Sequence, residues 1–262
     1  MSETGLIELM RRIGALGLAV LGLAGGLTVF SPLTGLVCLA AAVGLYVGLP
    51  SQKPPTGAVQ PEWQPTILMS DCIGFLVGVP FFALPLVAAA YVPSAVAGWT
   101  MLLFLPAAFC FPIFYVSARQ ATSWARFFGN GFEVTDFGLT MRLRYTELAR
   151  AEIRIWQLPR GLSLFAPFLD RRHGVTLVAG SAPSKALRLT SKTGAVFVIA
   201  TEAIPDLERI FVDMDRAGIE LPKGLSDLGR RRIRRVREKR WGKVEPEPTP
   251  ARKDQGRFGR TL

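Results

Sequence analysis

The side chains that could do chemistry are few in this chain and far apart. The one histidine, His173, lies in an arginine-rich stretch without a cysteine nearby. Asp213 and Asp215 are two residues apart in a helical pattern, so they do not share a face and we expect both to be solvated. Catalysis needs a positioned nucleophile, base or metal, and the sequence has no P-loop, nucleophile elbow or zinc-binding histidine pair. The sequence therefore predicts a non-catalytic protein without a cofactor; an enzyme working near the membrane would have to depend on His173.

The cysteines do not form a redox or metal-binding pattern either. Cys38, Cys72 and Cys110 all lie in apolar stretches, and no pair has the C-x-x-C spacing. Free cysteine packs well as a small apolar residue. We expect packing, without a disulfide framework or a zinc site.

Charge divides the chain into two unlike parts. Residues 1–118 carry three Lys/Arg and four Asp/Glu, a balance of −1, whereas residues 119–262 carry 28 and 16, a balance of +12. An apolar part followed by a basic part is typical of a membrane anchor joined to an aqueous region that faces something anionic.

Two long runs in the first part contain no charged residue: 40 residues over 13–52 and 47 residues over 72–118. One membrane span needs about 20 apolar residues, so each run is long enough for two. Ser31-Pro32 and Pro93-Ser94 give a turn signal near the middle of each run. The sequence predicts a four-helix transmembrane region over 1–122, built as two hairpins, with spans at 13–30, 33–49, 67–92 and 96–118.

Basic residues at the ends of this region predict its orientation. Arg11 and Arg12 precede the first span, and Arg119 and Arg126 follow the fourth, whereas both hairpin turns are uncharged. By the positive-inside rule both termini are then cytosolic, and the proline-rich connection 51–66 is a cytosolic loop that offers Trp63 as an interfacial anchor. We expect a multi-pass protein of a bacterial inner membrane.

Small residues spaced four apart mark where these helices could approach closely. Glycine on a membrane helix lets another backbone come near, either within the four-helix unit or on another membrane protein. The candidate positions for helix docking form three pairs: Gly22 and Gly26, Gly44 and Gly48, Gly74 and Gly78.

Asp71 is the one ionisable residue that qualifies for a role within the predicted spans. Transporters usually place such residues along the route of the substrate. A small transporter or channel subunit with Asp71 and kinked spans along its path is therefore the alternative function. Asp71 lies about one turn inside the third span, close enough to reach the interface, which favours an anchor instead.

After Arg119 the apolar period changes from helical to alternating. Residues 139–145 alternate strictly, and similar short runs occur at 126–134, 150–157, 175–180, 186–191 and 195–200. An amphipathic helix is expected at 203–217, ending at Gly218.

Two stretches of this part, FEVTDFGLTMRLRYTELARAEI and ALRLTSKTGAVFVIATEAIPDLERIFVDMDRAGI, resemble a bacterial pleckstrin-homology-like (PH-like) domain. The resemblance covers about 123–221 and implies a mostly β domain of five to seven antiparallel strands with one closing C-terminal helix. Some membrane proteins with similar domains are thought to assist the assembly of larger membrane complexes, so the resemblance implies an accessory role.

Two basic segments could contact a partner or a membrane surface. The long loop 158–174 mixes arginines with apolar side chains, and residues 229–241 carry eight Lys/Arg in a helical pattern, inside a basic, partly disordered tail at 222–262. Anionic lipid headgroups, an acidic protein partner and a merely solvated tail all remain open, whereas nucleic acid is disfavoured because no binding motif accompanies the arginines. The candidate contact residues are Arg171, Arg172, Arg230, Arg231, Arg232, Arg234, Arg235 and Arg237.

The sequence thus predicts an accessory, scaffold or assembly subunit of an inner-membrane complex. Its helices would anchor it beside another membrane protein, and its cytosolic domain would contact that partner or anionic lipid.

Overall fold

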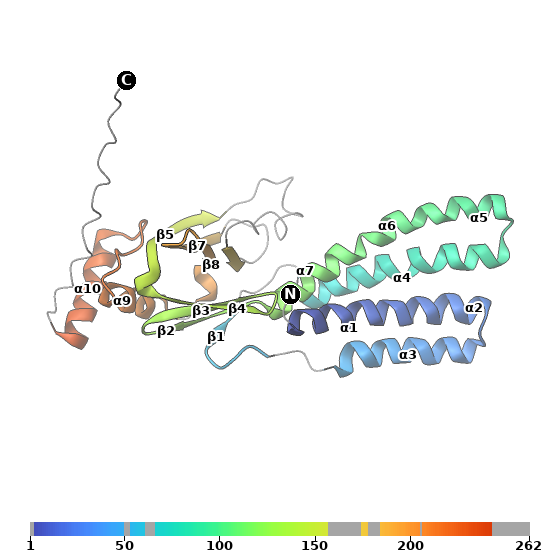
Figure 1. The fold of residues 1–262 in the computed structure, drawn as a ribbon, viewed down its shortest axis with the longest axis horizontal. Coiled ribbons are helices and arrows are strands. Elements are labelled where there is room, and N and C mark those ends of the chain that lie inside the picture. The colour runs from blue at the N-terminus through green and yellow to red at the C-terminus, as the bar shows by residue number, and fades with distance from the viewer. Residues whose placement is uncertain are drawn as a thin grey trace, which may run out of the picture.

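A computed structural model describes residues 3–49, 53–60, 66–156, 174–177, 184–204 and 206–242 of the chain. Helices make up the N-terminal part, and two β-sheets with two further helices make up the rest (Figure 1). The N-terminal helices pack side by side as a bundle, and the sheets lie at one end of it. The last two helices, α9 (Leu207–Arg216) and α10 (Asp227–Trp241), lie farthest from the bundle.

The first helical hairpin begins close to the N-terminus. Helix α1 (Glu3–Val20) continues through a π-helical turn (Leu21–Gly25) into the short α2 (Gly26–Thr28), and α3 (Pro32–Gly48) returns beside it. Ser31 caps α3, because its hydroxyl oxygen accepts a hydrogen bond of 3.2 Å from the Thr34 amide, and Pro32 takes the first helical position.

The second hairpin consists of α4 (Ile67–Tyr91) and a longer, interrupted helix. The interrupted helix comprises α5 (Ser94–Thr100), a 3₁₀ turn (Met101–Leu103), α6 (Phe104–Ala108) and α7 (Cys110–Thr122). Pro106 and Pro112 have no amide hydrogen to donate to the carbonyl four residues earlier. The breaks in the helix fall next to these two prolines.

Two of these helices, Ile67–Tyr91 and Val96–Thr122, are long and apolar enough to cross a membrane. Helix α3 is apolar but shorter, with 17 residues. The predicted turns are confirmed, since helix gives way around Ser31 and Pro93. Helix α1 starts ten residues before the first predicted span, so Arg11 and Arg12 lie within the helix instead of ahead of it.

The first sheet contains β1 (Ala58–Val59), β2 (Trp124–Phe128), β3 (Gly131–Asp136) and β4 (Leu139–Arg144), in that order and antiparallel. The expectation of a single strand over 126–134 is wrong. A two-residue turn at Gly129-Asn130 splits the run and pairs Phe128 with Gly131. Gly and Asn are typical of such turns. Strand β1 comes from the connection between the two hairpins, so Ala58 and Val59 of this connection belong to the sheet.

The second sheet has the order β5-β7-β8-β6, formed by β5 (Leu148–Trp156), β6 (Gly174–Leu177), β7 (Ser184–Ser191) and β8 (Val196–Ala200). The hairpin of β7 and β8 is confirmed, and Gly194 takes a positive φ of +89° in its turn. Strand β6 pairs in parallel with β8, contrary to the expected antiparallel pattern. A 3₁₀ turn (Tyr145–Glu147) leads from the first sheet into the second.

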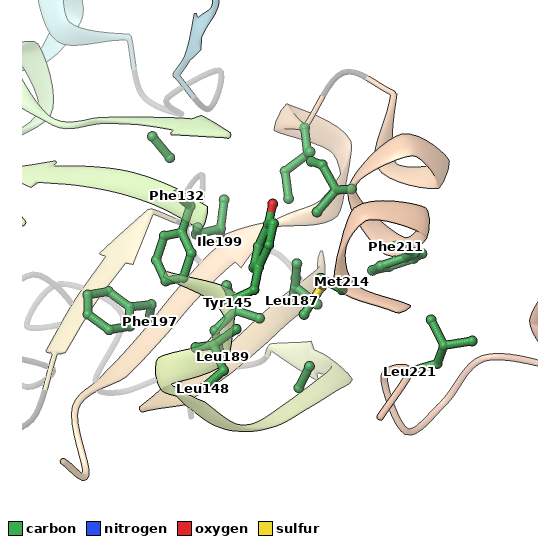
Figure 2. Close-up of a cluster of buried hydrophobic side chains, with 14 of the residues drawn as sticks. Phe132, Tyr145, Leu148, Leu187, Leu189, Phe197, Ile199, Phe211, Met214 and Leu221 are labelled. Carbon is green, nitrogen blue, oxygen red and sulfur yellow. The ribbon is translucent and has the colours of Figure 1, made fainter. Parts of the chain in front are cut away.

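A single apolar core joins both sheets to α9 (Figure 2). Phe132 of β3 packs edge-on against Phe197 of β8, with ring centroids 5.3 Å apart, and Met214 of α9 is fully buried in the same core. Helix α9 ends at Gly218 as predicted, because Gly218 has a φ of +76° and closes the last turn onto the Asp215 carbonyl.

The segment after α9 is also part of this domain. Lys223 lies along β5, where its carbonyl accepts a hydrogen bond of 2.8 Å from the Ile153 amide. Ser226 caps α10, and Ile233 of α10 is buried in the core. Residues 222–242 of the predicted tail are thus folded onto the domain. We call the two sheets with α9 and α10 the β domain.

Candidate functional site

A buried cluster of charges lies in the bundle, where α1, α3 and α4 meet. Arg12 is fully buried, and its Nε donates a hydrogen bond of 2.8 Å to Asp71 Oδ1. Its Nη1 donates at 2.7 Å to Glu8 Oε2, one turn earlier in α1. The hydroxyl of Tyr46 in α3 donates at 2.7 Å to the second oxygen of Asp71. The cluster therefore links three helices that are far apart in sequence.

Arg11 closes the cluster on its outer side. Its Nη2 lies 2.9 Å from Glu8 Oε2, its Nη1 donates to the Leu49 carbonyl, and its guanidinium stacks over the Tyr46 ring at 5.1 Å. Two arginines then face two carboxylates, so the cluster carries no net charge. Removing one partner from a buried pair leaves an uncompensated charge, which is the costly change.

Asp71 was predicted to lie near the interface, and Arg12 to act as a flanking charge. The structure brings the two together, and Asp71 is only 1% exposed. No local pattern indicates this pair, because its members are 59 residues apart. Among the described residues, no three His, Cys, Asp or Glu side chains lie close enough together to hold a metal ion.

The glycine pairs separate into two kinds. Gly22 and Gly26 both face Gly35 of α3, where an added Cβ would come within 3 Å of its backbone. A Cβ at Gly74 would lie 2.5 Å from the Phe114 side chain of α7, and one at Gly78 would lie 2.8 Å from the Leu16 side chain of α1 and 3.2 Å from Cys110 of α7. These four glycines therefore allow close packing inside the bundle.

Gly44 and Gly48 behave differently from the other four. A Cβ added at either position would meet nothing within 4 Å, and both glycines are exposed on α3. Of the three predicted docking pairs, this one alone faces outward.

The β domain is fixed to the bundle at the turn between β3 and β4. Arg119 of α7 donates two hydrogen bonds to the carboxylate of Asp136, at 2.7 and 3.2 Å. The next residue, Phe137, is buried with a φ of +48° and packs against Tyr115 at 5.2 Å. Its carbonyl lies so close to Gly5 of α1 that a Cβ there would be 2.6 Å away. This turn is thus held between the ends of α1 and α7.

The arginines of α10 divide into those used inside the domain and those that face outward. Arg237 pairs with Asp215 at 3.2 Å, Arg232 pairs with Glu208 at 2.9 Å, and Arg230 donates to the Leu225 and Pro222 carbonyls. Arg231, Arg234 and Arg235 are exposed and form no ion pair within the described residues.

The expectation that Asp213 and Asp215 are solvated is wrong. They are 7% and 8% exposed, because α9 is covered on one side by the sheets and on the other by α10. Burial raises the pKa of both carboxyl groups above its usual value, against the opposing effect of nearby arginines. Burial likewise raises the pKa of Tyr145, which lies near Asp213.

Asp213 also lines an open pocket of about 630 Å³ beside the β2–β3 turn. Arg144 and Arg216 border it, so the pocket offers both signs of charge. Its residues come from three separate segments, so no local pattern predicts the pocket.

Several predicted residues lie outside the part of the chain that the structure describes. These are Arg171, Arg172 and His173 of loop 158–174, Trp63, and the end of the tail from 243 onward.

Comparison with known proteins gives no assignment. No family model matches the chain, and no curated protein and no solved structure matches it either.

Proposed function

We propose that this protein is a non-catalytic accessory or scaffold subunit of a bacterial inner-membrane complex. Its helices form four membrane spans with both termini in the cytosol, and the β domain, of the PH-like kind, presents α10 to a partner or to anionic lipid. Two helices that are long and apolar enough to span a membrane support the anchor. Two sheets closed by a C-terminal helix support the PH-like assignment.

The observation that carries the proposal is the fixed junction between bundle and β domain. Phe137 and the Arg119–Asp136 pair join α7 and α1 to the sheet. Figure 1 shows the exposed basic helix α10 at the opposite end of the molecule. A rigid connection between an anchor and a distant charged surface is the arrangement that a scaffold requires.

The charge cluster favours an anchor over a transport path. Asp71 has both oxygens engaged, one by Arg12 and one by Tyr46, within a neutral group. An ion or proton route needs an ionisable group that exchanges with the passing species. Asp71 is instead held by Arg12 and Tyr46, which belong to the protein itself.

Membrane insertion and orientation can be tested on the full chain. We expect the protein to stay in membranes washed with alkaline carbonate. A fluorescent protein fused after Leu262 should fluoresce, and alkaline phosphatase inserted at Ser31 should be active. Extraction by carbonate, or an active phosphatase at the C-terminus, would contradict the proposal.

The accessory role needs its own experiment. Purified in mild detergent from its native membranes, the protein should carry a partner in a fixed molar ratio. A clean monomer that moves a solute across vesicle membranes, and loses this activity as Asp71→Asn, would establish the transporter alternative instead.

A further inference from the structure

The outward face of α10 has a specific composition. Leu228, Arg231, Arg235 and Lys239 are spaced by three and four residues, which places them in one row along the helix. All four are exposed, and Leu228 is 78% exposed. We call these four residues the outer row.

The opposite face of α10 is already occupied. Ile233 is buried in the core, Val236 and Trp241 pack against the core, and the guanidinium groups of Arg216 and Arg240 lie over the Trp241 ring. An amphipathic helix binds a bilayer by inserting its apolar face. The apolar face of α10 packs against the core, so it is not free to insert into a bilayer. The sequence pattern alone was compatible with a free apolar face.

The bilayer that would hold the bundle is also out of reach. Figure 1 shows the sheets between α10 and the helices, with α10 at the far end of the long axis. Attraction to anionic headgroups falls off within about 10 Å at ordinary ionic strength. The outer row therefore faces the aqueous phase.

The charges of the outer row have no ion-pair partner in the part of the chain that the structure describes. Arg231, Arg235 and Lys239 form no ion pair with any residue that the structure describes. Exposed acids stand beside them, since the side chains of Glu208 and Glu238 are 40% and 41% exposed. These carboxylates weaken the attraction of any polyanion, so the distinguishing feature is Leu228, which would gain nothing from a polyphosphate.

We propose that the outer row is a docking surface for an acidic segment of a partner protein, with Leu228 as its apolar contact. This rests on the proposed function and names the chemistry of the partner. Arginine and lysine pair with the carboxylates of the segment. Leu228 fits an apolar residue of that segment, as in helix-in-groove recognition.

Photo-crosslinking in cells tests the surface on the full chain. A benzoylphenylalanine is placed at Arg234, which flanks the outer row. We expect an adduct that protease destroys and ribonuclease does not, and whose crosslinked peptide is rich in Asp and Glu. The same photoreactive residue at Lys185, on the sheet, should give no such adduct.

Substitutions then separate protein docking from general attraction of polyanions. The triple variant Arg231→Gln, Arg235→Gln, Lys239→Gln should lower the adduct yield about tenfold. Its matched control removes three exposed cations elsewhere (Arg142→Gln, Lys185→Gln, Lys192→Gln) and should leave the yield unchanged. Leu228→Ser should lower the yield of the protein adduct, but should not change binding of a duplex RNA to the purified protein.

Three results would overturn the proposal. They are an adduct that ribonuclease removes, an adduct that organic solvent extracts as lipid, and no adduct at all. An adduct yield that is unchanged by Leu228→Ser would also contradict the proposal. None of these results affects carbonate resistance or reporter orientation, so the anchor is judged separately from the docking surface.

Discussion

Arg12 is a charged residue that is costly to bury, and it also connects two helices of this protein. Its guanidinium has no contact with solvent, and it faces Asp71 and Glu8 within a neutral group. The pair of Arg12 and Asp71 fixes α1 to α4. Charged residues inside apolar bundles are tolerated when they are matched in this way.

We expect Arg12→Gln to destabilise the protein by about 3–5 kcal/mol, because it leaves Asp71 buried without a cation. Asp71→Asn should have a similar effect, and the double variant should lose much less than the sum. Unfolding in detergent measures each loss. Arg231→Gln, which removes an exposed charge, serves as the control. Fully additive losses would show that the two residues do not act as a pair.

Asp213 makes stability depend on pH in a defined direction. Burial raises its pKa in the folded protein above its ordinary value of 3.8. The folded state then holds the proton more tightly than the unfolded chain does. The resulting contribution of Asp213 to the free energy of unfolding is fully present below pH 3.8 and is lost as pH rises through the pKa of the folded state.

The Asp213→Asn variant should therefore have a higher free energy of unfolding than the unmodified protein at pH 7. The difference in free energy of unfolding between the two proteins should be smaller at pH 4. Denaturant unfolding at the two pH values measures the change. A difference that is equal at both, or larger at pH 4, would mean that Asp213 is not the group that titrates.

At the scale of elements, glycine spacing alone did not reveal which helix faces are buried. Gly74 and Gly44 stand in identical motifs, yet one meets Phe114 and the other meets nothing. The glycine spacing indicates only that another helix can approach closely at that position. Which face is used depends on the partner helix, and that information lies in distant parts of the chain.

Gly74→Ala should cost about 1–3 kcal/mol, because the new Cβ would lie 2.5 Å from Cε1 of the buried Phe114 ring. Gly44→Ala should cost nothing measurable. Thermal unfolding in the same detergent compares the two. Equal effects at the two positions would show that the contact with Phe114 does not limit the side chain at position 74.

Helices were more predictable than strands, for a physical reason. Charge-free runs indicate the apolar helices, Pro32 and Pro93 mark where the two hairpins turn, and helical hydrogen bonds are local. The turn at Gly129-Asn130 lies inside the run 126–134, where the sequence predicts a single strand. The parallel pairing of β6 with β8 and the burial of α9 under α10 depend on contacts between distant segments. Neither the strand pairing nor the burial of α9 produces a recognisable pattern in the local sequence.

For the molecule as a whole, the elongated arrangement fixes the order of its parts along one axis. The bundle forms one end, the two sheets follow, and α10 forms the other end (Figure 1). Sequence reasoning found the parts and their order along the chain. It did not predict the distance between the basic helix and the helical bundle, because that distance follows from how the sheets stack on the end of the bundle.

This order predicts what lipid-borne quenchers can reach. In nanodiscs, a fluorophore attached through Lys239→Cys should be unaffected by spin-labelled lipids. The same label at Val47, an exposed position of α3, should be strongly quenched. The three native cysteines are first replaced by alanine. Quenching at position 239 would place α10 on the bilayer and restore the lipid-binding interpretation.

Strand β1 has a consequence for the order in which the chain can finish folding. Ala58 and Val59 pair with Arg126 and Ala125 of β2, and Gln60 donates to the Ser123 carbonyl. These partners are synthesised only after α4 and the long interrupted helix. The connection between the two hairpins must therefore wait for the second hairpin and the first β hairpin to emerge. Once the strand is in place, the sheet is attached to the bundle by two separate stretches of backbone, and a single cut between α7 and β2 would not set it free.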